Sequence, residues 1–270
     1  MVSMFDRFVH GILRVPYTLH VYRYSEAKKA KKTIVFLHGI GQSGKTWDDV
    51  VEHVPDDVNI AIIDLLGFGD SPKPEWASYD AKTQARAVAR TLLTLRVTNR
   101  VVIVGHSMGA LVAVEFARQF PGAVKALVLC SPPLYKMSRD GRRILERDNR
   151  MRELYAKVAE RPENIIMLSK IAKRYRLMNP SFDATAINLK SYVAALHASI
   201  IRQTAMNDII TVKKPIRILY GMLDPFVIGA NIRSVAQKSE NITIHRFTGG
   251  HEVTRGYVSR IANTIHKVLQ

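Results

Sequence analysis

The chain has 270 residues, of which 47% are hydrophobic, and it carries a formal net charge of +17 at pH 7. A chain of this length and composition can bury one sizeable core, so we expect one domain with an insertion rather than two independent folding units. The longest apolar runs are far shorter than the roughly 20 residues that a membrane-spanning helix needs. We therefore expect no transmembrane segment. The positive charge favours anionic partners, but no recognisable nucleic-acid module accompanies it, so we expect no nucleic acid as a partner.

Two features of the sequence bear on the compartment. The first fifteen residues do not resemble a secretory signal, because Asp6 and Arg7 interrupt the candidate hydrophobic segment and no small-residue cleavage site follows. The single cysteine, Cys130, has no partner for an internal disulfide, which fits a reducing compartment. Both features favour a cytoplasmic protein.

Short β-rich apolar runs alternate with segments of helical spacing along most of the chain. This alternation predicts an α/β fold with a doubly wound, mostly parallel sheet and helices on both of its faces. The expected strands are 33–37, 58–63, 101–104, 126–130, 216–220 and 242–247, with an antiparallel edge strand over 17–24. The expected helices are 46–53, 79–96, 108–119, 229–238 and 252–269.

The alternation breaks after Pro132, and no strand pattern returns before about Asp208. Helical spacing dominates this interval, with its last helical region near 184–205. Residues 134–207 hold fifteen Lys and Arg against seven Asp and Glu, so the insertion is strongly basic. We therefore predict a first core part over 1–132, a helical cap over 133–207 and a second core part over 208–270.

The string GHSMG at 105–109 marks a candidate nucleophile. It follows the apolar run VVIV and opens the segment ALVAVEFA, the strand–turn–helix setting in which a serine is held on a sharp turn with its hydroxyl exposed. Gly105 and Gly109 are expected there because the backbones of strand and helix leave no room for a Cβ. Ser107 is the predicted nucleophile, and the side chains of His106 and Met108 are expected to pack.

A serine hydroxyl needs a base to accept its proton and a carboxylate to orient that base. Asp224 follows the predicted strand 216–220, and His251 follows the predicted strand 242–247. Both residues therefore lie at carboxyl ends of strands, where an open parallel sheet builds its sites. The chain order Ser, Asp, His also fits this kind of fold. We predict that His251 transfers the proton and that Asp224 orients it.

With these motifs the chain resembles the capped α/β-hydrolase superfamily over nearly its whole length. The strings that carry the resemblance are LHG at 37–39, DLLGFGDS at 64–71, GHSMG at 105–109, GMLD ending at Asp224 and GGH ending at His251. The resemblance implies a helical cap inserted after strand six and an oxyanion hole formed by the backbone N–H groups of Ile40 and Met108. It also implies a supporting role for His38 and Gly39, and an architectural role for Asp64 and Ser71.

The resemblance further implies hydrolysis of a small-to-medium carboxylic ester through an acyl-enzyme. Serine at the nucleophile position disfavours the dehalogenase and epoxide-hydrolase relatives, which place Asp there. Carbon–carbon bond hydrolases and thioesterases stay open because they share the triad, and a ligand sensor with little turnover is the alternative of another class. The basic cap motivates a second hypothesis, in which anionic acyl substrates or an anionic lipid surface are favoured. The cap arginines behind it are Arg142, Arg143, Arg147 and Arg150.

A competing motif lies at residues 39–46, where GIGQSGKT matches the phosphate-binding pattern G-x-x-x-x-G-K-T. Trp47 is bulky at the point where such a loop enters its helix, and Asp48 and Asp49 would repel phosphates. A nucleotide site would also leave the Ser, Asp and His pattern unexplained, so we prefer the hydrolase interpretation. The sequence has no C-x-x-C or H-E-x-x-H string, so we expect neither a metal nor a cofactor, and the oligomeric state stays open.

Overall fold

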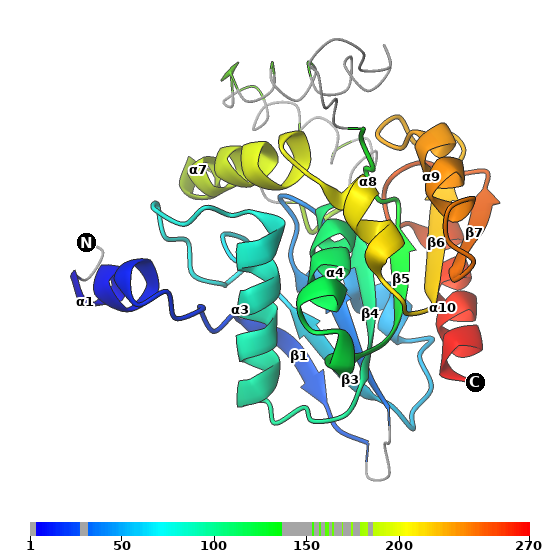
Figure 1. The fold of residues 1–270 in the computed structure, drawn as a ribbon, viewed down its shortest axis with the longest axis horizontal. Coiled ribbons are helices and arrows are strands. Elements are labelled where there is room, and N and C mark those ends of the chain that lie inside the picture. Colours follow the sequence, from blue (N-terminus) through cyan, green and yellow to red (C-terminus); the bar gives the residue numbers. More distant parts are fainter. Residues whose placement is uncertain are drawn as a thin grey trace.

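A computed structural model of the chain describes residues 4–27, 32–136 and 186–270, together with 153, 157, 160–161, 164, 169, 174 and 179–182. Its centre is a seven-stranded sheet with the strand order β1-β3-β2-β4-β5-β6-β7 (Figure 1). Every neighbouring pair is parallel except β1 and β3. The strands are β1 (Val21–Ser25), β2 (Thr33–Leu37), β3 (Asn59–Ile63), β4 (Val101–His106), β5 (Val124–Cys130), β6 (Ile216–Gly221) and β7 (Ile242–Phe247).

Helices cover both faces of this sheet (Figure 1). The α-helices with described bounds are α1 (Met4–Asp6), α2 (Asp48–Val51), α3 (Ala81–Thr94), α4 (Met108–Gln119), α7 (Ala186–Ala195), α8 (Ala205–Asp208), α9 (Gly229–Ala236) and α10 (Arg255–Leu269). Shorter or wider helical turns are η1 (Arg7–Ile12), η2 (Gly44–Trp47), η3 (Pro121–Ala123), η4 (Leu196–Ile201) and η5 (Ile209–Thr211). The expected doubly wound sheet is confirmed.

The side chains of the central strands alternate between two hydrophobic cores. In β2, Val35 and Leu37 pack with α3, α4 and α9, whereas Ile34 and Phe36 pack with α2 and α10. All five residues of this strand are buried. A parallel sheet that is covered on both faces requires continuously apolar strands, which explains why the run TIVFL does not alternate with polar residues.

The edge strand begins later than the pattern over 17–24 predicts. The backbone N–H of Leu19 donates to the Thr91 hydroxyl at 2.8 Å, and the N–H of His20 donates to the Ser71 hydroxyl at the same distance. These two N–H groups are satisfied by side chains instead of by a neighbouring strand, so regular pairing with β3 starts at Val21. The antiparallel orientation of this edge is as expected.

Between β5 and β6 the described residues form helices and no strand, and α7 lies above the carboxyl ends of the central strands (Figure 1). This placement fits a helical insertion. Its bounds, 133–207, stay a prediction, and the four cap arginines of the anionic-substrate hypothesis lie outside the described residues. Five strands precede this interval in the structure, whereas the resemblance places the cap after the sixth strand of the superfamily.

No helix in the described part of the chain is both long and apolar enough to cross a membrane.

The turn that joins β4 to α4 generates a stability prediction. A Cβ on Gly109 would lie 2.6 Å from the carbonyl oxygen of His38, in backbone that cannot move aside easily, whereas a Cβ on Gly122 would meet nothing within 4 Å. We expect Gly109→Ala to lower the free energy of unfolding by about 1–3 kcal/mol or more, because overpacking outweighs the roughly 1 kcal/mol gain in helix propensity. Urea denaturation followed by circular dichroism measures the change.

Gly122→Ala is the matched control, and its free energy of unfolding should stay within about 0.5 kcal/mol of the wild type. Equal stability of the two variants would contradict the tight backbone approach.

Candidate active site

Ser107 lies on the sharp turn between β4 and α4. Its backbone has φ 51° and ψ −117°, a conformation that is strained for a residue with a side chain. A Cβ on Gly105 would lie 2.6 Å from the carbonyl carbon of Gly109, so neither glycine can be replaced without moving the turn. The turn directs Ser107 away from the strand axis at the start of α4, with 6% of its surface exposed.

The structure brings the three predicted catalytic side chains into one line. His251 Nε2 lies 3.1 Å from Ser107 Oγ, and His251 Nδ1 lies 2.8 Å from Asp224 Oδ2. The backbone N–H of Phe226 donates to the other oxygen of Asp224 at 2.9 Å. These contacts come from the segments that follow β4, β6 and β7, which meet at the carboxyl edge of the sheet.

Electrostatics fix the proton arrangement of this line. Burial alone would raise the pKa of Asp224, but its hydrogen bond to His251 and the charge that His251 can carry outweigh burial, so the pKa lies below its usual range. Asp224 is therefore a carboxylate at neutral pH and accepts the Nδ1 hydrogen of His251. In the neutral imidazole, Nε2 then carries a lone pair that faces the hydroxyl of Ser107.

The loop after β2 approaches the nucleophile closely. A Cβ on Gly39 would lie 3.2 Å from the Cβ of Ser107 and 2.8 Å from the side-chain oxygen of Gln42, so a side chain at this position would crowd the loop. The next residue, Ile40, and the first residue of α4, Met108, each carry a backbone N–H that donates to no partner in the described part of the chain. Two donors without a partner among the described residues thus lie in the segments next to Ser107.

His38 supports this loop from below. Its Nε2 accepts a hydrogen bond from the backbone N–H of Leu65 at 2.9 Å, and its Nδ1 donates to the carbonyl of Gly39 at 2.7 Å. Only the neutral imidazole can accept and donate in this way, and burial lowers the pKa of His38. The 4.0 Å approach of His38 to Asp64 is therefore not an ion pair.

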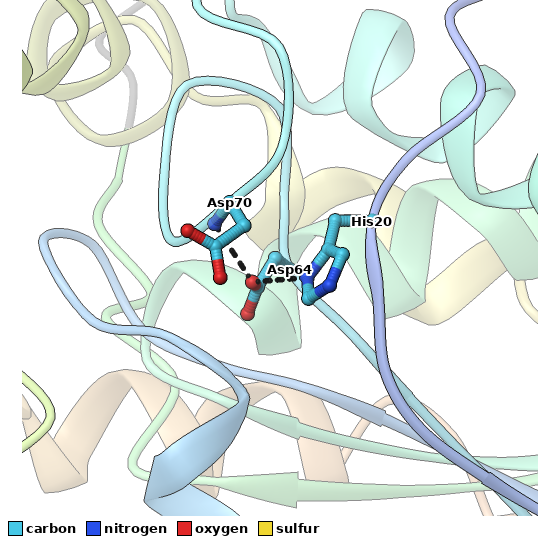
Figure 2. A group of neighbouring side chains, drawn as sticks. All are labelled: His20, Asp64 and Asp70. Atoms are coloured by element: carbon cyan, nitrogen blue, oxygen red, sulfur yellow. Dashed lines mark hydrogen bonds and ion pairs between the residues drawn. The ribbon is translucent and has the colours of Figure 1, made fainter.

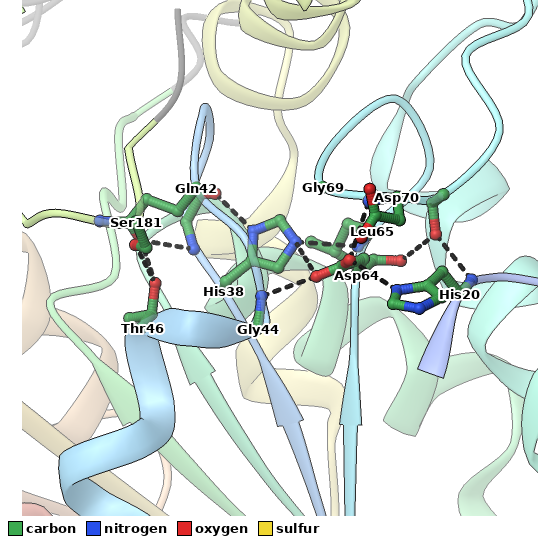
Figure 3. A network of polar contacts seen from close by, with 12 residues as sticks. His20, His38, Gln42, Gly44, Thr46, Asp64, Leu65, Gly69, Asp70 and Ser181 are labelled. Atoms are coloured by element: carbon green, nitrogen blue, oxygen red, sulfur yellow. Dashed lines mark hydrogen bonds and ion pairs between the residues drawn. The ribbon is translucent and has the colours of Figure 1, made fainter. Parts of the chain in front are cut away.

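Asp64 holds three segments around the site (Figure 3). Its carboxylate accepts hydrogen bonds from the backbone N–H of Gly44 at 2.6 Å and of Asp70 at 2.9 Å, and from the ring of His20 at 2.9 Å. The hydroxyl of Ser71 donates to the carbonyl of Asp64 at 2.6 Å. These contacts place Asp64 and Ser71 in the framework of the site and not beside Ser107.

The same carboxylate belongs to a cluster that could in principle hold a metal ion. Ligand atoms of His20, Asp64 and Asp70 lie within 4.8 Å of one another (Figure 2). However, both oxygens of Asp64 already accept N–H hydrogens, and the nearest nitrogen of His20 is one of the donors. A cation would have to displace these bonds, so we assign the cluster a structural role.

The geometry also opposes the nucleotide alternative for residues 39–46. A phosphate-binding loop directs its backbone N–H groups at the ligand. Here the N–H of Gly44 donates to Asp64, that of Gly39 to the side chain of Gln42, and that of Thr46 to the carbonyl of Ser43. The loop continues into a single 3-10 turn and a four-residue helix, α2.

The sequence patterns do not indicate a group of polar contacts that lies beside the predicted triad. Gln42 accepts from the N–H of Gly39 at 3.0 Å and donates to Glu252 at 2.9 Å, and burial raises the pKa of that carboxyl. His106 Nε2 lies 2.9 Å from the carbonyl of His251, which can only accept. His106, expected to be a packing residue, is therefore also a hydrogen-bond donor. Nothing in the sequence pairs positions as distant as these.

The protonation of His106 follows from its surroundings. Burial, and then the charge of the neighbouring His251, lower its pKa to about 3, so the ring is neutral. Its single N–H hydrogen is on Nε2, where it reaches His251. The 3.2 Å contact between Nδ1 of His106 and the side-chain oxygen of Gln42 is consequently a contact between two acceptors.

Comparison with known proteins places this site in a family. The sequence model of the alpha/beta hydrolase fold family matches residues 32–254, so the chain belongs to that family. It is 33% identical over 121 residues to a probable lysophospholipase, BODYGUARD 4, of Arabidopsis thaliana, a match that covers 44% of this chain and 29% of that protein. It is 38% identical over 128 residues to the lipase LipV of Mycobacterium tuberculosis, covering 47% of this chain and 46% of that protein. The chain thus spans less than half of either relative.

Solved structures show the same fold at low sequence identity. A bromoperoxidase from Bacillus anthracis superposes with a TM-score of 0.75 at 18% identity, covering 91% of this chain and 94% of that one. A thermophilic esterase from Thermogutta terrifontis gives a TM-score of 0.70 at 19% identity, covering 93% and 98%.

The contacts of Asp64 generate a second stability prediction. Asp64→Asn replaces one acceptor oxygen by an NH₂ group that faces N–H donors, and hydrogen bonds to a charged group contribute about 1.5–3 kcal/mol each. We expect this variant to lose roughly that amount of unfolding free energy at pH 7. Asp70→Asn is the matched control and should change the unfolding free energy little, because the backbone N–H of Asp70 makes the bond to Asp64.

The loss should depend on pH in a defined direction. Burial would raise the pKa of Asp64, but the neighbouring His38 ring and the N–H donors around the carboxylate together hold it below its usual range. A depressed pKa in the folded state stabilises the protein above the unfolded-state pKa, about 4, and this contribution disappears as the pH falls through the folded-state value. Urea denaturation at several pH values should show the two proteins converging in acid, and a constant difference would contradict the assignment.

Proposed function

We propose that the chain is a serine hydrolase that cleaves a small-to-medium carboxylic ester through an acyl-enzyme, with Ser107, His251 and Asp224 as its catalytic residues. The observation that carries this proposal is the continuous line from Asp224 through His251 to Ser107, at 2.8 and 3.1 Å. A hydroxyl that is bonded to a correctly oriented imidazole is an activated nucleophile.

The reaction begins when Ser107 Oγ attacks the ester carbonyl carbon and its proton moves to His251 Nε2. Asp224 stabilises the imidazolium that forms. When the carbon–oxygen bond of the leaving group breaks, His251 gives its proton to the departing alkoxide, and the acyl group stays on Ser107. A water molecule then attacks this acyl-enzyme, His251 accepts the proton of the water, and the free acid leaves as Ser107 regains its hydrogen.

The developing negative charge on the carbonyl oxygen needs donors in fixed positions. The N–H groups of Ile40 and Met108 are the candidates, because they flank Ser107 and have no other partner among the described residues. Removal of one such donor typically raises the barrier by about 2.7–4 kcal/mol. Met108 is also the first residue of α4, so the positive end of the helix dipole adds to the same stabilisation.

Aromatic side chains near the series of contacts from Asp224 through His251 to Ser107 favour an apolar acyl group. The ring of Phe226 lies 4.9 Å from the ring of His251, measured between centroids. Phe182 packs so close to the loop after β2 that a Cβ on Gly41 would lie 2.5 Å from the nearest ring atom, and Tyr192 of α7 packs edge-on against Phe182. The names of two relatives, a probable lysophospholipase and a lipase, support an ester bond, and the matches cover 29% and 46% of those proteins.

Thioesters and activated carbon–carbon bonds can be cleaved by the same line of residues, so these reactions are the alternatives within the same chemistry. A ligand sensor with little turnover is the alternative of another class. The partners of this proposal are a small-molecule acyl ester and water.

Replacement of the nucleophile tests the proposal directly. We expect the wild type to hydrolyse a p-nitrophenyl ester series of increasing acyl length and Ser107→Ala to fall to the background rate, because the variant has no group that can form the acyl-enzyme. Ser25→Ala, at an exposed position at the end of β1, is the matched control and should keep full activity. Stopped-flow release of p-nitrophenol measures both.

Activity that persists in Ser107→Ala would refute the assignment. If the wild type shows no ester activity but turns over a thioester or a carbon–carbon substrate, the assignment of the cleaved bond would change and the assignment of the triad would stay.

The role of Asp224 gives a separate prediction. Asp224→Asn keeps the shape of the side chain but can donate a hydrogen to Nδ1 of His251, which favours the tautomer with its hydrogen on Nε2. That hydrogen blocks proton transfer from Ser107, so we expect kcat to fall by about three to four orders of magnitude with little change in KM. Steady-state kinetics that show a mainly raised KM would instead place Asp224 in substrate binding.

A further inference from the structure

The segment Met4–Val15, here called the amphipathic segment, exposes an unusual amount of apolar surface. Met4, Phe5 and Ile12 are 90%, 74% and 69% exposed, and Leu13 is 56% exposed. Of the nine large hydrophobic side chains that are exposed in the described part of the chain, six belong to this segment. Concentrated exposure of this kind marks an interaction surface, whereas scattered exposed hydrophobic residues need no explanation.

The segment is attached to the fold by its other face. The ring of His10 stacks on Tyr17 at 3.7 Å between centroids, and the hydroxyl of Tyr17 donates to Asp6 at 3.4 Å. Gly11 faces Trp76, whose indole nitrogen would lie 3.9 Å from a Cβ at position 11. α1 and η1 project beyond the body of the molecule next to α3 (Figure 1), which leaves the opposite face directed outward.

The spacing of the apolar residues matches this geometry. Met4, Phe8 and Ile12 recur every four residues, and the N–H of Leu13 donates to the carbonyl of Phe8 at 2.9 Å across a wide helical turn. A helix with such i→i+5 bonds turns more slowly than an α-helix, so residues four and five apart share a face. The result is one apolar stripe that no described element covers.

The charges around the stripe indicate what covers it. Arg7 and Arg14 are exposed at its border, while the acid of the segment, Asp6, is bonded to Tyr17 and lies 3.5 Å from His10. Two copies of a chain with a net charge of +17 would repel each other at this face. An apolar stripe with a basic border is instead the pattern of helices that lie in the plane of an anionic membrane surface.

We propose that the amphipathic segment binds the surface of an anionic lipid bilayer, with Met4, Phe8 and Ile12 among the upper acyl chains and with Arg7 and Arg14 at the headgroup phosphates. In this mode the helix lies in the plane of the membrane surface and does not cross the bilayer. It is independent of the catalytic proposal, because it requires none of the residues of the triad.

The same segment is also connected to α7, the helix above the carboxyl ends of the strands. The loop that carries Trp76 continues from Glu75, which is bonded to Lys190 of α7 at 2.7 Å. The hydroxyl of Ser191 in α7 donates to Tyr79, which lies in the same connection between β3 and α3. The amphipathic segment and the helix above the site therefore contact one short stretch of chain.

Vesicle co-sedimentation of the full chain tests the proposal. The probes are vesicles of phosphatidylcholine alone and of phosphatidylcholine with phosphatidylglycerol in equal parts. We expect the wild type to sediment with the anionic vesicles and much less with the neutral ones. The double variant Phe8→Ser, Ile12→Ser should lower the partition coefficient at least about tenfold, because insertion of apolar side chains supplies the attraction that salt does not screen.

Leu93→Ser is the matched control, because Leu93 is 68% exposed but lies on α3 outside the segment. This variant should bind as the wild type does, and Arg7→Gln with Arg14→Gln should weaken binding to anionic vesicles alone. All variants should hydrolyse a water-soluble p-nitrophenyl ester at the wild-type rate, which separates this test from that of the catalytic proposal.

Three results would overturn the proposal. The wild type could fail to sediment with anionic vesicles, or the Phe8→Ser, Ile12→Ser variant could bind them equally well. The third result is a lipid-free dimer in sedimentation velocity that dissociates in this double variant, which would assign the apolar stripe to a second copy of the chain.

Discussion

The close approach of α4 to β2 is the constraint on which the rest of the site depends. Gly109 of α4 touches the backbone at the end of β2, and only a residue without a Cβ permits this distance. The approach forces the connection from β4 into a turn so sharp that Ser107 adopts a positive φ. Strain of this kind costs on the order of 1–3 kcal/mol and persists only where the surrounding core imposes it. The buried strands on both sides of β4 supply that core.

A second constraint organises the loops around the turn. Loops at the carboxyl edge of a parallel sheet have few partners of their own, so their N–H groups need acceptors. The carboxylate of Asp64 satisfies donors from the loop after β2 and from the loop after β3 at once. His38 adds a neutral link between the same two loops. The result is a rigid platform on which the donors beside Ser107 keep their positions.

Much of this arrangement is predictable from sequence because it is encoded locally. Continuous apolar runs identify the strands, and the strings around Ser107, Asp224 and His251 each follow a strand directly. The pattern over 17–24 starts the edge strand too early, because the first N–H groups of this segment bond to Thr91 and Ser71, which lie far along the chain. For the same reason no pattern could reveal that Gln42 meets Glu252, since only the folded chain brings them together.

The surroundings of each histidine give residues of the same type different protonation and hydrogen-bond partners. The ring of His106 is neutral and donates to a backbone carbonyl, and the ring of His38 is neutral and bridges two loops, whereas the ring of His251 lies beside a carboxylate. Burial keeps the first two uncharged. Residue type alone therefore does not identify a candidate catalytic histidine, whereas placement directly after a strand distinguishes His251 in the sequence.

The hydrogen bonds of Gln42 to Glu252 and of His106 to His251 have a consequence for how this chain can diversify. They tie the loop that carries Ile40 to the loop that carries His251, so the two cannot drift apart when the helices above them change. Positions that must agree within a fraction of an ångström are thereby fixed during folding, before any ligand arrives. Substitutions in α7 can then change the surface above the carboxyl edge of the sheet while the geometry of the loops beneath it stays the same.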